Sequence, residues 1–467
     1  MGSRLGRQLG EWYQGGAVAQ SLSDRIRMLI LDGRLTVGER VPSERALAAE
    51  IGRSRATVTK AYETLADAGY LARLHGSGTR VALPHRSATR VPAPTDDVID
   101  LTIASVGSTP GLHAATVRAL DRLASLLGTP GYSLDGLPEL RERIAARYAE
   151  RGLPTDPSQI VVTSGAMHAL TLITAAFGER GRAAIVEQPT FPHAMEALRR
   201  VGMRLVPTPV TPEGWDLAHL AGRIRETRPG IVYTIADLHN PTGATMPDLE
   251  RAKLAATARS VGALVIVDET CVELDVDRGW TPHPFAAHGP AISIGSMSKL
   301  AWGGLRIGWI RAEAQHVERL LAVRPSFDLG SPLLEQCIAT ELLDDMDGLL
   351  EHTRRRLTAG RASVRAGVAA HLPGVTLPEV PGGLAAWVDL GAPVSTSLSL
   401  AAREHGLLLP PGPRFTATGV LDRFARIPIT WEPEVMDAAM ERLGMAWQDL
   451  RAGSTPRATA YEERAIV

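Results

Sequence analysis

The chain has 467 residues, of which 45% are hydrophobic and 22% charged, and its formal net charge is −1. This length predicts two or three folding units, and the composition is that of a soluble globular protein. The two cysteines provide no disulfide framework and no metal-ligand cluster. The first arginines precede no apolar signal-peptide core, and no apolar run reaches the roughly 20 residues of a membrane span. We therefore expect a cytoplasmic protein without a membrane partner.

Charge and lysine are unevenly distributed along the chain. Residues 1–83 contain twelve Arg or Lys and eight Asp or Glu, so this segment is basic and the remainder carries a net charge of −5. A basic N-terminal segment suits a nucleic-acid partner, although a surplus of this size is weak support alone. Lysine occurs only as Lys60, Lys253 and Lys299. Chemistry that needs a primary amine therefore has three candidates.

The first predicted elements form a helix-turn-helix. Ser43 can cap a helix over 44–51, Gly52 makes the turn, and Ser54 can cap a second helix that runs to about Ala68. The spacing of the apolar residues in the second helix predicts one buried face, made by Val58, Ala61, Tyr62 and Leu65. In a helix-turn-helix the second helix enters the major groove of DNA. A small helical bundle without a nucleic-acid role remains the alternative on spacing alone.

Two predicted strands, 70–73 and 79–83, follow this pair of helices and flank a Gly-rich tip. The string PSERALAAEIGRSRATVTKAYETLADAGYLARLHGSGTRV, Pro42 to Val81, resembles the winged-helix domain of the GntR family of bacterial regulators. The resemblance implies a domain over 1–83 that binds double-stranded promoter DNA. It places Arg45 against the DNA backbone or groove edge. It places Ser54, Arg55, Thr57 and Thr59 on the recognition helix. His75 and Gly76 would form a wing that lies in the minor groove. A basic residue is frequent in the family where this chain has Thr59.

The pattern changes after this domain. Prolines among small polar residues predict an extended linker over 84–99. Short β-branched runs then alternate with amphipathic helical stretches, which is typical of a mostly parallel sheet covered on both faces. The pattern becomes mixed α+β toward the C-terminus. We expect an α/β domain over 100–325, a smaller α+β subdomain over 326–452 and a disordered tail over 453–467.

Lys299 is the strongest candidate for covalent chemistry. An amine that forms a Schiff base with an aldehyde cofactor must be a lysine beside phosphate-binding groups. Lys60 belongs to the DNA-binding helix, and Lys253 lies in an Ala-, Arg- and Glu-rich stretch typical of a solvated helix. Lys299 follows a predicted buried strand in SIGSMSKLAWGGLRIGW, among serines and glycines.

The motifs around Lys299 resemble the fold-type I aminotransferases of class I and II, over about 101–443. The resemblance implies that pyridoxal 5'-phosphate is bound to Lys299, the one residue given a catalytic role. It implies that Phe191 stacks on the cofactor ring, that Asn240 donates to the 3'-oxygen and that Asp268 pairs with the pyridinium nitrogen. The phosphate site that it implies is made by the turn after a strand and by residues near Lys299, namely Ser164, Gly165, Ala166, Ser296, Ser298 and Arg306. It also implies that Arg426 binds a carboxylate of the substrate or effector, and that Tyr132 reaches the phosphate of a neighbouring subunit.

Cys271 is a departure from this family. It stands where the family usually has a tyrosine that hydrogen-bonds the 3'-oxygen, three residues after the strand-end aspartate. A thiol is a weak donor, so Asn240 would hold that oxygen and catalysis would be weakened while cofactor binding is retained. A reactive-thiol role for Cys271 is an alternative that we consider less favoured.

A GntR-type winged helix joined to an aminotransferase-like domain resembles the MocR subfamily of transcription regulators. This implies a homodimer, with each DNA-binding domain often lying against its partner's large domain. It also implies a regulator that senses pyridoxal 5'-phosphate, an amino compound or both through an aldimine at Lys299, with weak or half-transaminase activity as an open question. The alternatives are a working aminotransferase with an appended DNA-binding domain, and a large domain that serves only as a dimerisation scaffold.

Overall fold

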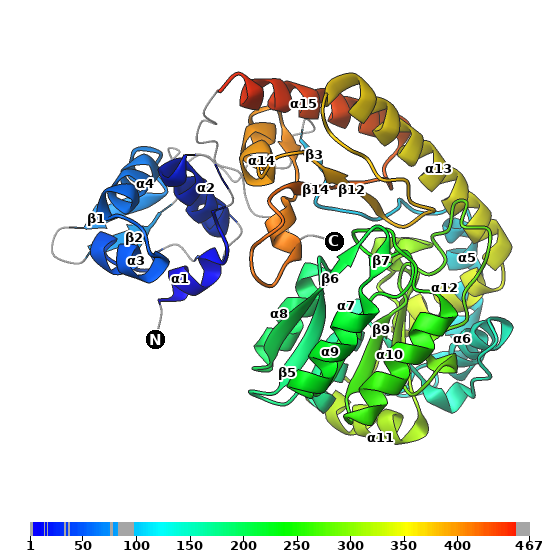
Figure 1. Ribbon diagram of the computed structural model, residues 1–467. Helices are drawn as coiled ribbons and strands as arrows, with labels where there is room; N and C mark the ends of the chain where they lie inside the picture. The colour runs from blue at the N-terminus through cyan, green and yellow to red at the C-terminus, as the bar shows by residue number, and fades with distance from the viewer. Residues whose placement is uncertain are drawn as a thin grey trace.

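The computed structural model describes residues 3–13, 15, 17–31, 34–35, 38–74, 78–82 and 98–453. His75 and Gly76, assigned to the wing, lie outside the described residues, as do most of the expected linker and tail. None of the described helices combines the length and apolarity that a membrane crossing requires. Figure 1 shows the N-terminal domain beside two larger layered units.

The N-terminal domain contains helices α1 (Arg4–Leu9), α2 (Val18–Leu31), α3 (Glu44–Ile51) and α4 (Arg55–Asp67), followed by an antiparallel pair, β1 (Leu71–Leu74) and β2 (Gly78–Val81). Both predicted caps are present, since the hydroxyl of Ser43 accepts from the N–H of Ala46 and that of Ser54 from the N–H of Thr57. Gly52 adopts φ 63°, a left-handed conformation that glycine reaches without steric cost. The four apolar residues expected on the inner face of α4 are all buried. The helix-turn-helix prediction is therefore confirmed.

The large domain is built on one eight-stranded sheet. Its five central strands, from β10 to β6, are parallel. Strands β11 and β7 run antiparallel to their neighbours β10 and β6, and β4, which pairs antiparallel with β11, runs in the direction of the central strands. In spatial order the strands are β4 (Ile160–Thr163), β11 (Gly308–Arg311), β10 (Ile292–Ser296), β9 (Leu264–Asp268), β8 (Ile231–Thr234), β5 (Ala183–Gln188), β6 (Arg204–Thr211) and β7 (Gly214–Trp215). This confirms the mostly parallel sheet.

Helices cover both faces of this sheet. One face packs on a core that includes residues of α7 (Ala166–Phe177), α8 (Pro192–Arg200) and α11 (Ala314–Val323). The other packs on a core that includes residues of α9 (Leu217–Thr227) and α10 (Asp248–Ser260). With both faces covered, β8, β9 and β10 are buried at nearly every position rather than at alternate ones, as the sequence pattern predicted.

The C-terminal unit is smaller and mixed. It contains the antiparallel pair β12 (Ala385–Asp389) and β14 (Phe424–Pro428), the short strand β13 (Leu407–Leu408), and helices α13 (Met346–His371), α14 (Ser395–Glu404) and α15 (Pro433–Arg451). Helices α13 and α15 pack along each other over the pair (Figure 1).

The packing departs from the expected domain boundaries at two places. Strand β3 (Ile99–Asp100) pairs with β13, so residues at the expected linker end join the C-terminal unit. Helix α12 (Leu333–Leu343) packs against α5 (Leu112–Leu126) and α6 (Pro138–Glu150), so the chain beyond residue 325 still contributes to the large domain. Both departures are long-range pairings, which local patterns do not reveal.

Candidate functional site

The central feature of the large domain is a pocket of about 640 Å³ at the carboxyl ends of the parallel strands. This is where open α/β sheets bind ligands. The pocket brings together nine of the expected cofactor residues, together with Met167, Ile235, Thr270 and Leu384. The nine are Ala166, Phe191, Asn240, Asp268, Cys271, Ser296, Ser298, Lys299 and Arg306.

Lys299 supplies the primary amine of this pocket. It ends a short 3-10 turn directly after β10, and its Nζ donates to the carbonyl oxygen of Ala104 at 2.9 Å. Burial lowers the pKa of Lys299 to about 8, and the nearby Arg426 and Arg306 act in the same direction. A larger fraction of this amine is therefore neutral, and nucleophilic, near neutral pH than for an ordinary lysine.

Asp268 is a carboxylate held in a fixed orientation. One oxygen accepts from the hydroxyl of Tyr233 at 2.9 Å, and the other accepts from the hydroxyl and the N–H of Thr270, at 2.6 and 3.0 Å. A fixed carboxylate at the pocket wall can pair with a protonated ring nitrogen. Tyr233 and Thr270 are positioning residues that our sequence analysis missed. The Asp268-Glu269-Thr270 spacing could have suggested the second.

Asn240 lies across the pocket with an unused acceptor. Its side chain is 7% exposed and its Oδ1 has no hydrogen-bond partner among the described residues. The preceding His239 is held by Glu187, whose carboxylate also accepts from the N–H of Ile235 at 2.9 Å and from Trp215 at 2.8 Å. This buried carboxylate supports the loop that presents Asn240, a role that the sequence did not suggest.

An anion site lies at the pocket end nearest α7. No side chain among the described residues caps α7, and the N–H of His168 donates to the oxygen of Gly165 at 3.1 Å, which leaves the N–H groups of Ala166 and Met167 to face an anion. Arg306 reaches across and donates to the backbone oxygen of Ser164 at 2.9 Å. A Cβ at Gly165 would lie 2.6 Å from Nη2 of Arg306, so glycine is needed for this close approach. Ser164 and Gly165 therefore border the anion site through Arg306, although they do not line the pocket.

Cys271 is a buried pocket residue with a protonated thiol. Burial raises the pKa of its thiol to about 12, and Asp268 acts in the same direction. The thiolate is the reactive form of cysteine. This environment therefore disfavours the reactive-thiol alternative.

Arg426 is buried beside the pocket. Its Nη2 donates to the carbonyl oxygen of Thr102 at 2.6 Å, while Nε and Nη1 have no hydrogen-bond partner among the described residues. Its guanidinium lies 5.1 Å from the centre of the Phe415 ring. Burial lowers the pKa of Arg426. Two free nitrogens on a buried cation suit a carboxylate.

Tyr132 is the expected cofactor residue that lies apart from the pocket. It is 72% exposed and does not line the pocket of its own chain.

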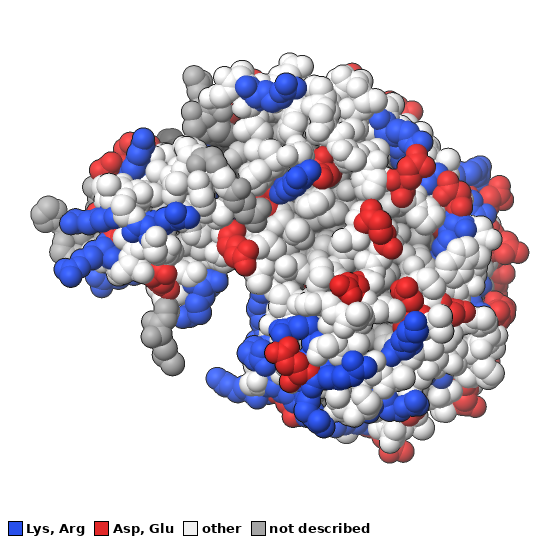
Figure 2. All heavy atoms as spheres, in the orientation of Figure 1, with Lys and Arg blue, Asp and Glu red and all other residues white. Residues whose placement is uncertain are grey.

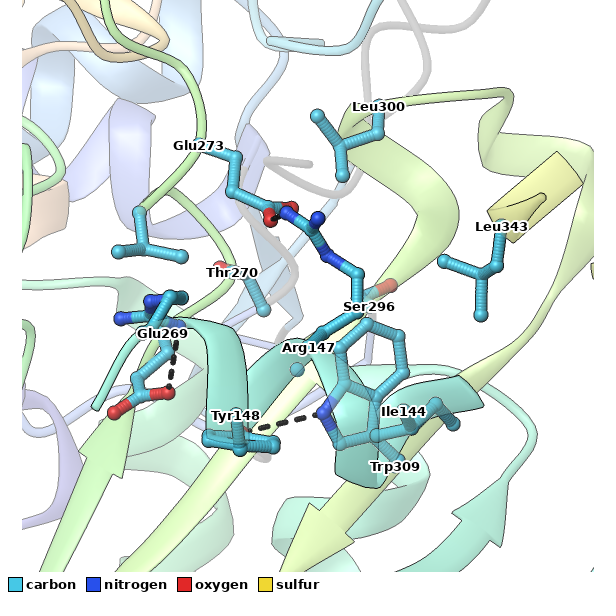
Figure 3. Close-up of a pocket in the computed structure, with 13 residues that line it drawn as sticks. Ile144, Arg147, Tyr148, Glu269, Thr270, Glu273, Ser296, Leu300, Trp309 and Leu343 are labelled. Atoms are coloured by element: carbon cyan, nitrogen blue, oxygen red, sulfur yellow. Dashed lines mark hydrogen bonds and ion pairs between the residues drawn. The ribbon is translucent and has the colours of Figure 1, made fainter. Parts of the chain in front are cut away.

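A second pocket, of about 500 Å³, lies beside the first and shares Thr270 and Ser296 with it. Figure 3 shows Tyr148 pointing toward Trp309, whose indole N–H donates to the phenol at 3.3 Å. The charged residues of this pocket form ion pairs, Arg147 with Glu273 and Arg151 with Glu269. Because these charges neutralise one another and no lysine lines this space, the first pocket is the candidate site.

The recognition helix presents an exposed basic end. Arg55, at the start of α4, has a side chain 72% exposed, and its Nη2 lies 3.7 Å from Glu44, which also accepts from the hydroxyl of Thr59 at 2.9 Å. Ser54 and Arg45 are exposed, and Thr57 is half-buried. Figure 2 shows Lys and Arg side chains gathered on the outer side of this domain.

Comparison with known families agrees with both halves. The sequence model of the aminotransferase class I and II family matches residues 118–443, more than half of the chain. The chain belongs to this family. The model of the gntR family of bacterial regulatory proteins matches residues 18–81.

Individual relatives extend this picture. The chain is 29% identical to the uncharacterized HTH-type transcriptional regulator YdcR of Escherichia coli, over 92% of this chain and 99% of that protein. It is 28% identical to the HTH-type pyridoxine biosynthesis transcriptional regulator PdxR of Corynebacterium glutamicum, over 80% of this chain and 83% of that protein. The structure resembles the α-aminoadipate aminotransferase LysN of Thermus thermophilus, complexed with N-(5'-phosphopyridoxyl)-L-leucine, with a TM-score of 0.70 and 27% identity over 76% and 94% of the two chains.

These findings identify the cofactor and the class of protein. The cofactor is pyridoxal 5'-phosphate, and the fixed Asp268 carboxylate, the N-terminus of α7 and the glycine beside Arg306 fit its ring nitrogen and phosphate. The fusion of an aminotransferase domain with a GntR helix-turn-helix is consistent with a transcription regulator of the MocR type.

Proposed function

We propose that this chain is a promoter-binding regulator that senses pyridoxal 5'-phosphate, an amino compound or both at Lys299. The observation that carries this proposal is a single segment, residues 411–421, that contacts both the residues next to Phe191 in the large domain and the DNA-binding domain. A regulator needs such a connection, because a ligand shifts an equilibrium only if it interacts differently with two arrangements of the protein.

Toward the pocket, the segment is anchored beside the residue expected to stack on the cofactor ring. The carbonyl oxygen of Phe415 accepts from the N–H of Thr190, which precedes Phe191, at 2.8 Å. The hydroxyl of Thr418 donates to Gln188 at 3.1 Å. The ring of Phe415 also packs on Arg426. A ligand that moves Phe191 or Arg426 therefore moves this segment.

Toward the DNA-binding domain, the same segment meets the end of α1. The carbonyl oxygen of Thr418 accepts from the N–H of Glu11 at 2.9 Å, and Gly419 lies against Arg25. The neighbouring helix α14 adds Leu400, which packs into the core of the DNA-binding domain, and Ser397, whose hydroxyl donates to Asp24 at 3.2 Å. Figure 1 shows α14 facing α2 across this contact.

The pocket residues divide the recognition of a ligand among them. The cofactor, when bound, supplies an aldehyde to amines and an electron-accepting ring. Lys299 holds it, Asp268 keeps the ring nitrogen protonated, and Asn240 donates its amide N–H to the 3'-oxygen. Ala166, Ser296, Ser298 and Arg306, with the adjoining Ser164 and Gly165, hold the phosphate. Arg426 binds the carboxylate of an amino-acid effector, since two of its nitrogens have no partner within the described structure.

DNA contact belongs to the N-terminal domain in this proposal. Arg45 meets the DNA backbone or the groove edge, while Ser54, Arg55, Thr57 and Thr59 lie at the start of the recognition helix. Glu44 holds Arg55 and Thr59 in the free protein. DNA phosphates would compete with this carboxylate for Arg55.

A homodimer completes the proposal, with Tyr132 serving the partner's cofactor phosphate. Large apolar side chains that precede Tyr132 in sequence are exposed, namely Leu127 at 75%, with Val117 and Leu120 on α5 at 52% each. Ser133 forms a β-bridge with Gly330, which brings the exposed Leu329 near Tyr132. Exposed apolar surface is typical of protein interfaces where such side chains form one patch.

An active aminotransferase with an appended DNA-binding domain is the alternative function. The complete lysine, aspartate and arginine set favours it. Cys271 counts against it, because its weak donor replaces the usual tyrosine.

Substitution of Lys299 tests the proposal. DNA from upstream of the chain's own gene is titrated with protein at fixed salt, with and without pyridoxal 5'-phosphate and candidate amino acids. We expect the affinity to change with ligand in the unsubstituted protein and in Lys253→Ala, and to be insensitive to ligand in Lys299→Ala. Thermal unfolding checks that Lys299→Ala remains folded.

Two results would contradict sensing at Lys299. One is an unchanged ligand response in folded Lys299→Ala. The other is sustained transamination at an enzyme-like rate, above about 1 per second, which would favour the alternative function.

A further inference from the structure

Three side chains with metal-ligand chemistry meet at the N-terminal end of α10, outside the cofactor pocket. Asp248 is the first residue of α10, and His283 and His288 flank the 3-10 turn Phe285–Ala287. One ligand atom from each of the three residues lies within 4.8 Å of the others. The sequence predicted no metal-ligand cluster, because Asp248 lies 35 and 40 positions before the two histidines and becomes their neighbour only in the fold.

The spacing of His288 and Asp248 suits a shared cation. Nε2 of His288 lies 3.3 Å from Oδ1 of Asp248, while Nδ1 of His283 forms a hydrogen bond of 2.7 Å with Oδ2, a bond that a metal would replace. Oδ1 of Asp248 and Nε2 of His288 are both buried, and neither forms a hydrogen bond within the described structure. Two ligands of a tetrahedral zinc ion, each about 2.0–2.1 Å from the metal, stand about 3.3 Å apart. The His288–Asp248 pair therefore has the separation of two ligands without the geometry of a hydrogen bond.

The scaffold holds these ligands in place. The fully buried Arg251 donates to the carbonyl oxygen of His283 at 3.0 Å and to that of Met246 at 2.7 Å, which ties the histidine loop to the start of α10. On the other side, a Cβ at Gly152 would lie 2.6 Å from the His283 ring. Ligands that are positioned before binding lose little entropy when a metal arrives.

We propose that Asp248, His283 and His288 bind one divalent transition-metal ion of the zinc class. Two imidazoles and one carboxylate select zinc, nickel or copper, whereas magnesium and calcium prefer all-oxygen sites. The side chain of His283 is 57% exposed, so water can complete the coordination.

The site also connects to the cofactor pocket. Arg251 forms an ion pair with Asp237 at 2.7 Å, three residues before Asn240. A bound metal would brace the loop that presents Asn240. The metal proposal itself does not depend on ligand sensing, because its test measures metal binding alone.

Equilibrium dialysis against Zn²⁺ tests the proposal. Tag-free protein with its cofactor bound is freed of metal with a chelator and dialysed at pH 7.5. We expect one Zn²⁺ per chain with micromolar affinity, and at least about tenfold weaker binding in His288→Gln and Asp248→Asn. His193→Gln is the matched control, because His193 pairs with Glu196 at 2.9 Å without belonging to such a group, and its binding should be unchanged.

Cobalt provides a second readout. Co²⁺ at this site should give visible ligand-field bands without the charge-transfer absorption of a thiolate, which separates it from binding at either cysteine. Absence of saturable Zn²⁺ binding at micromolar concentrations, Zn²⁺ binding by both variants as tight as by the unsubstituted protein, or a thiolate signature would overturn the proposal.

Discussion

Lys299 is a primary amine in a buried environment. Burial disfavours the charged form of an amine, so most lysines in proteins stay exposed. An exposed lysine is almost fully protonated near neutral pH, with a pKa of about 10.4. Burial brings the pKa of Lys299 to about 8, and the Asp268 carboxylate only partly opposes the shift. The pocket therefore prepares the amine for an aldehyde before the cofactor arrives.

This environment predicts how cofactor loading depends on pH. The neutral amine attacks the aldehyde, so the loading rate of cofactor-free protein should rise as pH increases from 6.5 and level off above about pH 8, as Lys299 loses its proton. The rate is followed by visible absorption of the lysine-bound cofactor. It is divided by the rate for a free lysine derivative in the same buffers, which corrects for ionisation of the cofactor. A ratio that stays constant with pH would show that the pocket does not lower this pKa.

The sequence pointed to pocket residues that stand together in one motif. It did not point to residues that are distant in the chain and meet only in the fold. Ser296, Ser298 and Lys299 lie in one short string, so their family resemblance located them at once. Tyr233 reaches Asp268 from the next strand. Ala104 meets Lys299 across 195 positions. Contacts of this kind follow from strand order and chain path, which local periodicity does not encode.

At the scale of elements, the segment 411–421 joins three parts of the molecule through backbone groups. The carbonyl oxygens of Phe415 and Thr418 accept from N–H groups on opposite sides, in the large domain and the DNA-binding domain. Because backbone acceptors are available to every residue type, nothing in the side-chain pattern marked this segment. Helices α3 and α4 were predicted closely for the opposite reason, since their caps and turn depend on particular side chains.

Substitution of Gly10 tests this connection. Gly10 has φ 61°, and a Cβ there would lie 1.8 Å from the carbonyl oxygen of Thr418. We expect Gly10→Ala to separate the DNA-binding domain from the segment, so DNA affinity persists while its dependence on pyridoxal 5'-phosphate is lost. The measurement is the ratio of DNA affinities with and without the cofactor.

Gly262→Ala is the control for introducing Ala at a glycine with positive φ. Gly262 has φ 71°, and a Cβ there would meet no atom within 4 Å. Gly10, with ψ −147°, lies in a region that is essentially restricted to glycine, so Gly10→Ala adds backbone strain as well as the contact with Thr418, and thermal unfolding checks that both variants remain folded. A full cofactor response in Gly10→Ala, or an equal loss in both variants, would argue against signalling through the segment.

The whole molecule, taken as one chain, leaves Tyr132 and several large apolar side chains exposed close together in sequence. Tyr132 lies outside the pocket of its own chain, next to the bridge that joins Ser133 to Gly330. The nearby residues Leu127, Phe327 and Leu329 are 48–75% exposed. A second copy would explain both features, since it would cover the surface and receive the tyrosine. The sequence predicted this arrangement only through family resemblance, because periodicity cannot show which exposed face is covered by another chain.

Mixed dimers can show whether Tyr132 serves the partner's site. Tyr132→Phe removes the hydroxyl and keeps the ring, and loss of one hydrogen bond to a charged group costs about 1.5–3 kcal/mol, which weakens cofactor binding roughly 10- to 100-fold. Heterodimers of this variant with Lys299→Ala, isolated with two different tags, contain one Lys299. If Tyr132 crosses to the partner, that lysine shares its site with the intact tyrosine of the other chain, and cofactor titration should give one site per dimer with unsubstituted affinity. If Tyr132 acts within its own chain, that site keeps the weak affinity of the Tyr132→Phe homodimer, and the proposed role across the interface is wrong.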